Sequence, residues 1–203
     1  MKELFDNEKI IDNVKNIHMI GIGGSGMCPL AEILFSKGYL LTGSDNNIGD
    51  PLMRLKEKGV KVFLGHDENN IEGAELVVYS AAISKDNPEI IAAQEKGIPL
   101  MERATLLGAL TRKYNNVIGV CGTHGKTTVS SLITHILYYN NYDPTAVIGG
   151  LLPIIKANGR AGNSELMVCE SCEYVDTFLK LSPDITVLLN IDNDHMEYFK
   201  TME

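Results

Sequence analysis

The stretch from Val117 to Thr128 constrains the fold more than any other part of the chain. Its sequence, Val-Ile-Gly-Val-Cys-Gly-Thr-His-Gly-Lys-Thr-Thr, begins as an apolar run typical of a buried strand and continues as a glycine-rich loop. Apolar side chains recur behind the loop at the spacing of an amphipathic helix: Val129, Leu132, Ile133, Ile136 and Leu137. This order of strand, loop and helix predicts a phosphate-binding loop in an α/β domain.

The loop has the residues that binding a nucleoside triphosphate requires. Backbone N–H groups of a tight glycine loop can converge on phosphate oxygens, and the start of the helix adds partial positive charge. Lys126 adds a full charge, and the Thr127 hydroxyl can hold a magnesium ion. The longer form of the pattern has a glycine where this chain has Val120, so the alternative is a glycine-rich turn with an incidental lysine. The predicted ATP-binding residues are Gly122, Thr123, His124, Gly125, Lys126, Thr127 and Thr128.

A second glycine loop lies near the start of the chain. Residues 20–26, Ile-Gly-Ile-Gly-Gly-Ser-Gly, follow an apolar strand and satisfy the Gly-x-Gly-x-x-Gly fingerprint of diphosphate-binding loops. Asp45 lies at the tip of the next predicted strand, about where a dinucleotide-binding protein holds a ribose. Taken alone, this region is typical of an NAD-binding domain, and a packing role for the glycines is the simpler alternative.

Strand and helix signals alternate along the whole chain, which predicts an α/β fold with parallel sheets and helices on both faces. The polar stretch 111–116 separates two blocks that each begin with an apolar strand and a glycine loop. We place the domain boundary there, with a Rossmann-like domain over residues 1–112 and a second domain over residues 113–203. The predicted strands are Ile17–Ile20, Leu40–Gly43, Lys61–Phe63, Leu76–Tyr79, Leu100–Met101, Val117–Cys121, Leu166–Glu170 and Ile185–Asn190.

Composition narrows the classes of function. The chain has 18 basic and 26 acidic residues, a net charge of −8, which argues against non-specific binding to nucleic acid or to anionic membranes. It has no apolar run long enough to span a membrane and no basic, apolar leader, so we expect a cytoplasmic protein. The second block shows few strand signals and stops abruptly, so we expect the chain to be a fragment of a longer protein.

Cys169 and Cys172 have the only suggestive cysteine spacing. A structural zinc site would need a second Cys or His pair, and Cys169 ends an apolar strand. We therefore interpret both as ordinary thiols and keep a redox pair as the alternative.

Nine short motifs, in order along nearly the whole chain, resemble those of the Mur ligases. They are Gly21–Met27, Gly43–Asp45, Gly65–His66, Ser80–Ile83, Asp86–Glu89, Gly122–Thr128, Asp143–Thr145, Phe178–Pro183 and Asn190–His195. The resemblance implies a first domain that binds the UDP end of a sugar nucleotide, not NAD. It also implies the first part of a P-loop, ATP-binding central domain, without the C-terminal domain that binds the amino acid. The implied UDP-sugar-binding residues are Gly21, Gly23, Gly24, Ser25, Gly26, Asp45, His66 and Ser80.

The reaction implied by the resemblance is an ATP-dependent amide ligation in peptidoglycan precursor synthesis. The carboxylate of UDP-N-acetylmuramate takes the γ-phosphoryl group of ATP, and the amine of L-alanine then displaces phosphate. By resemblance, Lys126 and His195 are catalytic, and Thr127, Glu170 and His195 hold Mg²⁺. Without the C-terminal domain we expect no complete ligation by this chain. The alternatives are a related ligase that recycles a murein tripeptide, a non-catalytic nucleotide-sugar-binding module and an NAD-dependent oxidoreductase.

Overall fold

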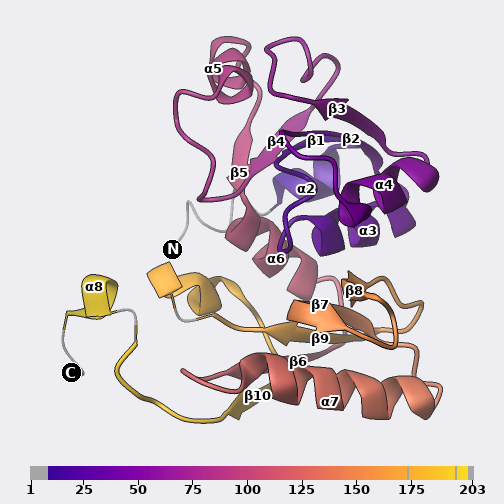
Figure 1. The fold of residues 1–203 in the computed structure, drawn as a ribbon, viewed down its shortest axis with the longest axis vertical. Coiled ribbons are helices and arrows are strands. Elements are labelled where there is room, and N and C mark those ends of the chain that lie inside the picture. The colour runs from indigo at the N-terminus through magenta and orange to yellow at the C-terminus, as the bar shows by residue number, and fades with distance from the viewer. Residues whose placement is uncertain (1–8, 173, 195, 201–203) are drawn as a thin grey trace. The chain divides into compact units, whose positions relative to one another are not determined.

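The computed structural model describes residues 9–172, 174–194 and 196–200. The chain divides into two compact units, Met1–Ala109 and Leu110–Glu203, and each is built around a five-stranded sheet (Figure 1). Helices alternate with strands in both units, so the predicted α/β fold class is confirmed. In the part of the chain that the structure describes, no helix combines the length and the apolar character of a membrane span.

The sheet of the first unit is wholly parallel, with strand order β3-β2-β1-β4-β5. β1 lies at its centre, and the strand order reverses beside it, so the carboxyl end of β1 faces the crevice where such sheets bind ligands. The elements of this unit are α2 (Ile10–Asn13), β1 (Asn16–Ile20), α3 (Cys28–Ser36), β2 (Leu40–Asp45), α4 (Asp50–Glu57), β3 (Lys61–Leu64), β4 (Leu76–Tyr79), α5 (Pro88–Glu95), β5 (Leu100–Glu102) and α6 (Arg103–Thr111), which runs into the second unit.

Close packing between β2 and the start of the first glycine loop depends on Gly43. A Cβ atom at this position would lie 2.6 Å from the Ile22 side chain and 2.8 Å from the backbone oxygen of Met19. A side chain at position 43 would therefore push the loop away from the sheet, and the glycine in β2 is required for the loop to sit where it does.

The second unit has a mixed sheet with strand order β10-β6-β9-β7-β8. Its strands pair in parallel except for β7 and β8, which are antiparallel. The elements are β6 (Asn116–Cys121), α7 (Lys126–Tyr139), β7 (Thr145–Leu152), β8 (Ala157–Arg160), β9 (Leu166–Glu170), the 3-10 helix η1 (Tyr174–Lys180), β10 (Ile185–Leu188) and α8 (Met196–Phe199).

The sequence analysis missed two strands of this sheet, and its expectation of purely parallel sheets is wrong for this edge. β7 begins with the strand-forming residues Thr-Ala-Val-Ile but is interrupted by the pair Gly149–Gly150, and β8 reads Ala-Asn-Gly-Arg, which is not a composition typical of a strand. The antiparallel pairing of β8 with β7 therefore does not follow from local preference. The predicted strand Ile185–Asn190 ends earlier, at Leu188.

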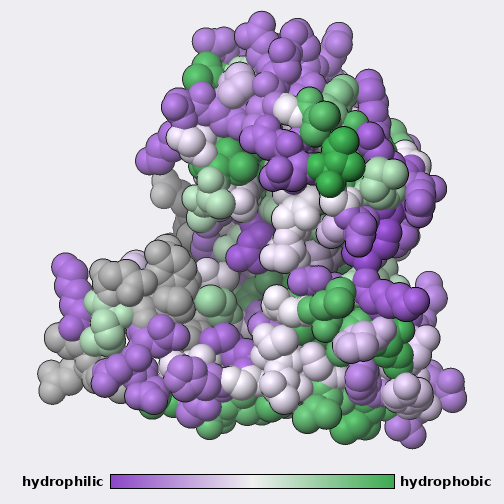
Figure 2. Space-filling view, in the orientation of Figure 1, coloured by the Kyte–Doolittle hydropathy of each residue, from purple (hydrophilic) through white to green (hydrophobic). Residues whose placement is uncertain are grey.

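Helix α7 is present as predicted, but its buried side is not the apolar stripe. The fully buried side chains are Ser130 and Thr134, whereas Leu132 and Ile136 are 55% and 63% exposed. Figure 2 shows apolar surface where Figure 1 draws α7. Small hydroxyl side chains let the helix pack closely on the sheet, and both hydroxyls bond to backbone carbonyls within the helix.

Candidate nucleotide-binding sites

The first glycine loop leaves the carboxyl end of β1 in a tight turn held by Ser44. The backbone oxygen of Ser44 accepts hydrogen bonds from the N–H groups of Gly21 (2.8 Å) and Ile22 (3.1 Å). Gly21 has a φ of +72°, a conformation that side chains rarely allow. Gly24 and Ser25 form the exposed tip of the turn. The predicted UDP-binding glycines thus lie together at the ligand-binding edge of the sheet.

The Asp45 carboxylate forms a hydrogen bond to the backbone of the first glycine loop. Its Oδ2 atom accepts a hydrogen bond from the N–H of Gly23 (2.9 Å), and its Oδ1 atom accepts one from Asn47 (3.0 Å). The sequence analysis predicts that Asp45 contacts the nucleotide or the sugar. In this structure the carboxylate shapes the loop, and the N–H of Gly23 is already paired.

A cation that the sequence analysis missed lies against the end of this loop. A Cβ atom at Gly26 would be 3.2 Å from Nη1 of Arg103 and 3.4 Å from its Cζ atom. Arg103 begins α6 directly after β5, so it stands at the carboxyl edge of the sheet. A basic residue two positions after the predicted strand Leu100–Met101 was the signal that could have identified it.

Ser80 and His66 follow two other strands of the same sheet. Ser80 comes directly after β4, where its backbone oxygen accepts a hydrogen bond from Ile83 in a tight turn. His66 follows β3, with its side chain 14% exposed and its Nδ1 atom 3.0 Å from both Ser44 Oγ and Glu89 Oε2. The predicted UDP-sugar residues therefore lie at the carboxyl ends of β1 to β4: Asp45 is the last residue of β2, and the others are on the loops that follow β1, β3 and β4.

Glu89, in the first turn of α5, is fully buried beneath this edge. Burial by itself would raise the pKa of its carboxyl group. The hydrogen bonds and the charge of its neighbours outweigh burial and lower the pKa to about 2, so the group is an anion at neutral pH. Its neighbours within 3.5 Å are His18, Ser44, His66 and Asn70. The sequence analysis quotes this segment only as a motif; in the structure Asn87 caps α5, and its Oδ1 atom accepts a hydrogen bond from the N–H of Glu89 (2.9 Å).

The second glycine loop joins β6 to α7 and is held by an amide side chain. Asn190 Oδ1 accepts a hydrogen bond from the N–H of His124 (2.8 Å), and Asn190 Nδ2 donates to the backbone oxygen of His124 (3.0 Å). Gly122 has a φ of +131°, and a Cβ atom there would lie 3.0 Å from the Asn190 backbone. The loop therefore requires glycine at position 122, and Asn190 is a loop-shaping residue that the sequence analysis quoted in a motif but gave no role.

Lys126 folds back over this loop. Its Nζ atom donates to the backbone oxygens of Gly122 (2.6 Å) and Thr123 (3.2 Å), which holds the ammonium group at the mouth of the loop. Gly125 has a φ of +87° and caps α7, while Thr127 and Thr128 are exposed in its first turn. The predicted ATP-binding residues thus form one continuous loop and helix start.

Thr127 and Glu170 border a common space beside Gly149. A Cβ atom at Gly149 would lie 2.7 Å from Glu170 Oε2 and 3.4 Å from Thr127 Oγ1, so a side chain there would fill this space. The other carboxylate oxygen, Oε1, accepts hydrogen bonds from Ser130 Oγ (3.1 Å) and Gly149 N (2.8 Å). A carboxylate and a hydroxyl oxygen are the ligand types that Mg²⁺ prefers.

His195, the third predicted metal ligand and a predicted catalytic residue, lies outside the described residues. Among those that are described, no three or more His, Cys, Asp or Glu side chains form a group that could hold a metal ion. The donors that border the space beside Gly149 include the carboxylate of Glu170 and the hydroxyl of Thr127.

Comparison with protein families matches both units. The profile "Mur ligase family, catalytic domain" matches residues 16–115, and "Mur ligase middle domain" matches residues 120–203. The chain belongs to the Mur ligase family. The resemblance found in the sequence motifs is therefore confirmed.

Individual Mur ligases match over nearly the whole chain. A UDP-N-acetylmuramate--L-alanine ligase from Clostridium botulinum (strain Langeland) is 49% identical over 194 residues, which cover 96% of this chain and 42% of that protein. The crystal structure of the ligase MurC from Thermotoga maritima matches with a TM-score of 0.84 at 31% identity, covering 92% of this chain and 44% of that one. The chain thus spans about two fifths of the length of the curated relative it matches.

A second type of Mur ligase has a similar fold. The crystal structure of a UDP-N-acetylmuramate:L-alanyl-gamma-D-glutamyl-meso-diaminopimelate ligase from Neisseria meningitides matches with a TM-score of 0.80 at 27% identity. It covers 92% of this chain and 63% of that one. Both types of ligase therefore share the fold of this chain.

Cys169 is an inert thiol in this Mur ligase chain. It is fully buried in β9, where burial, followed by the charge of Glu170, raises its pKa to about 12. It forms no disulfide with Cys172. A thiol that stays protonated is a poor nucleophile, which favours the interpretation as an ordinary cysteine over a redox pair.

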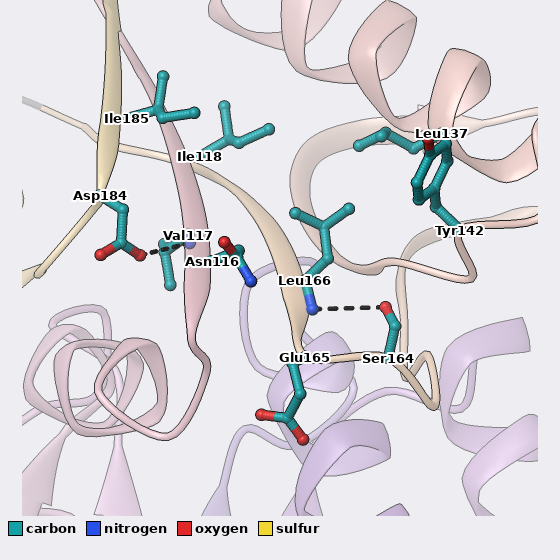
Figure 3. A pocket seen from close by; sticks show the side chains of 10 residues that line it. All are labelled: Asn116, Val117, Ile118, Leu137, Tyr142, Ser164, Glu165, Leu166, Asp184 and Ile185. Carbon is teal, nitrogen blue, oxygen red and sulfur yellow. Dashed lines mark hydrogen bonds between the residues drawn. The ribbon is translucent and has the colours of Figure 1, made fainter.

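A pocket in the second unit lies away from the second glycine loop. Figure 3 shows that it is lined by residues at the amino ends of the strands, including Val117, Leu166 and Ile185. Hydrogen bonds from Val117 N to Asp184 Oδ2 and from Leu166 N to Ser164 Oγ tie its wall together. The glycine loop follows the carboxyl end of β6, at the opposite edge of the sheet, so this pocket contains none of the predicted site residues.

Proposed function

We propose that this chain provides the two nucleotide sites of an enzyme that ligates L-alanine to UDP-N-acetylmuramate at the expense of ATP. The observation that carries the proposal is the 49% identity to a curated ligase of that name, over a stretch that includes both glycine loops. We place the reaction in the cytoplasm because both of its nucleotide substrates, ATP and a UDP-sugar, are cytoplasmic metabolites.

The first unit binds the UDP end of the sugar nucleotide. The loop of Gly21 to Gly26 offers exposed backbone at the carboxyl edge of a parallel sheet, and Arg103 supplies a positive charge beside it for the diphosphate. His66 and Ser80 follow neighbouring strands and contact the nucleotide or the sugar. Asp45 supports the loop from the side of β2.

The second unit binds ATP. The phosphates occupy the mouth of the loop at the start of α7, where the helix N-terminus and Lys126 both favour negative charge. Lys126 exchanges its two backbone acceptors for the β- and γ-phosphate oxygens. Its role is catalytic because it stabilises charge on the transferred phosphoryl group.

The residues around Gly149 fit a magnesium ion. Thr127 and Glu170 would hold it, together with His195 from the predicted ligand set, and the ion would neutralise charge on the triphosphate. Glu170 is held for this task by Ser130 and by the backbone of Gly149, which fix Oε1 and leave Oε2 directed at the same space as the Thr127 hydroxyl.

The chemistry needs positioning more than covalent participation by the protein. The muramoyl carboxylate attacks the γ-phosphorus of ATP, which gives an acyl phosphate and ADP. The amine of L-alanine then attacks the acyl carbon, phosphate leaves, and the amide forms with loss of a proton from the amine. Holding two anionic substrates together against their repulsion is the main work of the loops and of Lys126.

Ligation of a murein tripeptide to the same sugar nucleotide is the second candidate, because a ligase of that type matches with a TM-score of 0.80. Among the solved structures, that enzyme is 27% identical to this chain and the alanine ligase from Thermotoga maritima is 31% identical, and the curated relatives at 48–49% identity are named alanine ligases, which favours alanine. The match of both units to Mur ligase profiles gives no support to the NAD-dependent oxidoreductase considered from the first loop alone.

Calorimetric titration of the 203-residue chain tests the proposal. We expect UDP-N-acetylmuramate and, with magnesium, a non-hydrolysable ATP analogue to bind at separate sites, and NADH not to bind. Replacing Gly23 with valine should abolish binding of the sugar nucleotide and leave binding of the ATP analogue unchanged, since a Cβ atom at position 23 would already lie 3.0 Å from Asp45 Oδ2. Binding of NADH without binding of the sugar nucleotide would contradict the proposal.

A further inference from the structure

The buried carboxylate of Glu89 lies between two imidazole rings. His18 in β1 places its Nε2 atom 3.5 Å from Oε1, and His66 places its Nδ1 atom 3.0 Å from Oε2. Asn70 Nδ2 donates to Oε1 (2.7 Å) and Ser44 Oγ donates to Oε2 (2.6 Å). Both carboxylate oxygens are thus occupied by donors, without any contact to solvent.

The partners of His66 decide which of its nitrogens carries a proton. An ionised carboxylate can only accept hydrogen bonds, so Glu89 Oε2 accepts from Nδ1 of His66. The single proton of the Ser44 hydroxyl is donated to Glu89, so Ser44 Oγ can only accept from His66 as well. Both contacts of Nδ1 therefore require an N–H group at that atom, and the neutral ring has a bare Nε2.

His18 has the opposite arrangement. Its Nε2 atom faces the carboxylate, and its Nδ1 atom is 2.8 Å from the hydroxyl of Thr42, which can donate to it. Within the described residues Nε2 makes no hydrogen bond, but it faces an anion, so we expect the neutral ring of His18 to carry its proton on Nε2. One carboxylate thus sets opposite tautomers in its two imidazole neighbours, and only His66 is exposed to a ligand, with 14% of its side chain accessible against 0% for His18.

Ser44 connects this network to the first glycine loop. Its backbone oxygen holds Gly21 and Ile22, and its hydroxyl contacts both His66 and Glu89. The ring of His66 is therefore held against the same strand end that holds the loop. In the described part of the chain, its Nε2 atom makes none of the hydrogen bonds that the structure shows.

We propose that Glu89 is a positioning residue, which together with Ser44 keeps the proton of His66 on Nδ1 and presents the bare Nε2 atom as a hydrogen-bond acceptor to a hydroxyl group of the sugar nucleotide. The proposal deepens the proposed function of the first unit and rests on it for the identity of the ligand. The position of the proton on His66 does not depend on the ligand, so the proposed tautomer and the proposed ligand can be refuted separately.

The proton position is tested by nitrogen-15 NMR of histidine-labelled chain without ligand, on the neutral side of the imidazole titration. His66, assigned with the His66→Ala variant, is expected as the Nδ1–H tautomer and His18 as the Nε2–H tautomer. Glu89→Gln should abolish the preference of His66, because an amide offers one acceptor atom where the carboxylate offered two. An Nε2–H tautomer for His66 in the unmodified chain would overturn the proposal.

The consequence for binding is tested with a double-mutant cycle. In the unmodified chain, Glu89→Gln should weaken binding of UDP-N-acetylmuramate about fivefold, the usual range for one lost hydrogen bond. In the His66→Ala background the same substitution should change the affinity by less than about twofold, because Glu89 acts through His66. An equal loss in both backgrounds would show a merely structural role and contradict the positioning.

Matched variants keep the test decisive. If Glu89→Gln does not fold, Ser44→Ala tests the same assignment from the other side: it removes the second acceptor of Nδ1 but leaves the Glu89 carboxylate, so His66 should stay the Nδ1–H tautomer, and an Nε2–H tautomer in this variant would contradict the positioning by Glu89. Thr42→Val is the control, because it alters His18 on the far side of the carboxylate and should leave the His66 tautomer and the affinity unchanged. Absence of any sugar-nucleotide binding to a chain with the expected tautomers would refute the proposed ligand and its contact with Nε2, but not the positioning of His66 by Glu89.

Discussion

The two glycine loops are shaped by side chains of different charge. Asp45, an acid, accepts from the N–H of Gly23 in the first loop, whereas Asn190, a neutral amide, accepts from the N–H of His124 in the second. The first loop contains no cation of its own, and Arg103 reaches it from another element. The second loop contains Lys126. The positive charge at the first loop, which an acid shapes, thus comes from another element. The positive charge at the second loop, which an amide shapes, comes from the loop's own Lys126.

The largest effect is expected from Gly122→Ala, which breaks the second loop alone. The substitution combines a left-handed backbone with a Cβ 3.0 Å from the backbone of Asn190, so the loop must move. We expect ATP-analogue affinity to fall by at least about 100-fold, with sugar-nucleotide affinity unchanged, as measured by calorimetry. Gly38→Ala, at a φ of +87° but with nothing within 4 Å, is the control for strain without a clash and should retain ATP binding.

Lys126→Met removes the cation of the second loop. The loss of charge-assisted hydrogen bonds to phosphate should weaken ATP-analogue binding about 10- to 100-fold, and the loop should keep its shape because Asn190 still holds it. The salt dependence of ATP-analogue binding should fall as well. Unchanged affinity would mean that Lys126 stays on its backbone acceptors when the nucleotide binds.

Arg103→Met makes the equivalent change at the first loop. Because this cation reaches the loop from α6, we expect a smaller loss, about tenfold in affinity for UDP-N-acetylmuramate. Lys96→Met removes an exposed cation elsewhere in the same unit and should have no effect. If both variants lowered the affinity equally, the charge near Gly26 would have no special role.

The smallest effect is expected from Asp45→Asn, which gives the first loop an amide acceptor like the one that Asn190 provides in the second loop. The amide can still accept from Gly23 N, and a negative charge near the diphosphate is removed, so sugar-nucleotide affinity should rise about twofold to fivefold. A loss of affinity would show instead that the carboxylate binds a ligand hydroxyl, as the sequence alone predicts.

The strand–loop–helix units could be predicted from the sequence because their signals are local. Apolar runs that end in glycine, as at Ile20 and Cys121, mark strands buried on both faces of a parallel sheet. The antiparallel pair β7–β8 could not be predicted, since Gly149 and Gly150 interrupt the strand pattern of β7 and the composition of β8 is not typical of a strand.

The supporting contacts of the sites were less accessible to sequence analysis. Arg103, Asn190 and Glu89 lie far along the chain from the groups they contact, and no spacing rule connects them. The buried face of α7 was misjudged because Ser130 and Thr134 satisfy their hydroxyls on the helix backbone, which lets polar residues occupy the inner side.

Ser44 contacts two parts of the first site with different atoms of one residue. Its carbonyl holds the first glycine loop and its hydroxyl holds the network of Glu89 and His66. Any residue at position 44 supplies the carbonyl, so only the network depends on the serine side chain. Across related sequences we expect residues 44, 66 and 89 to vary as a set, while replacements that affect only the loop arise independently of them.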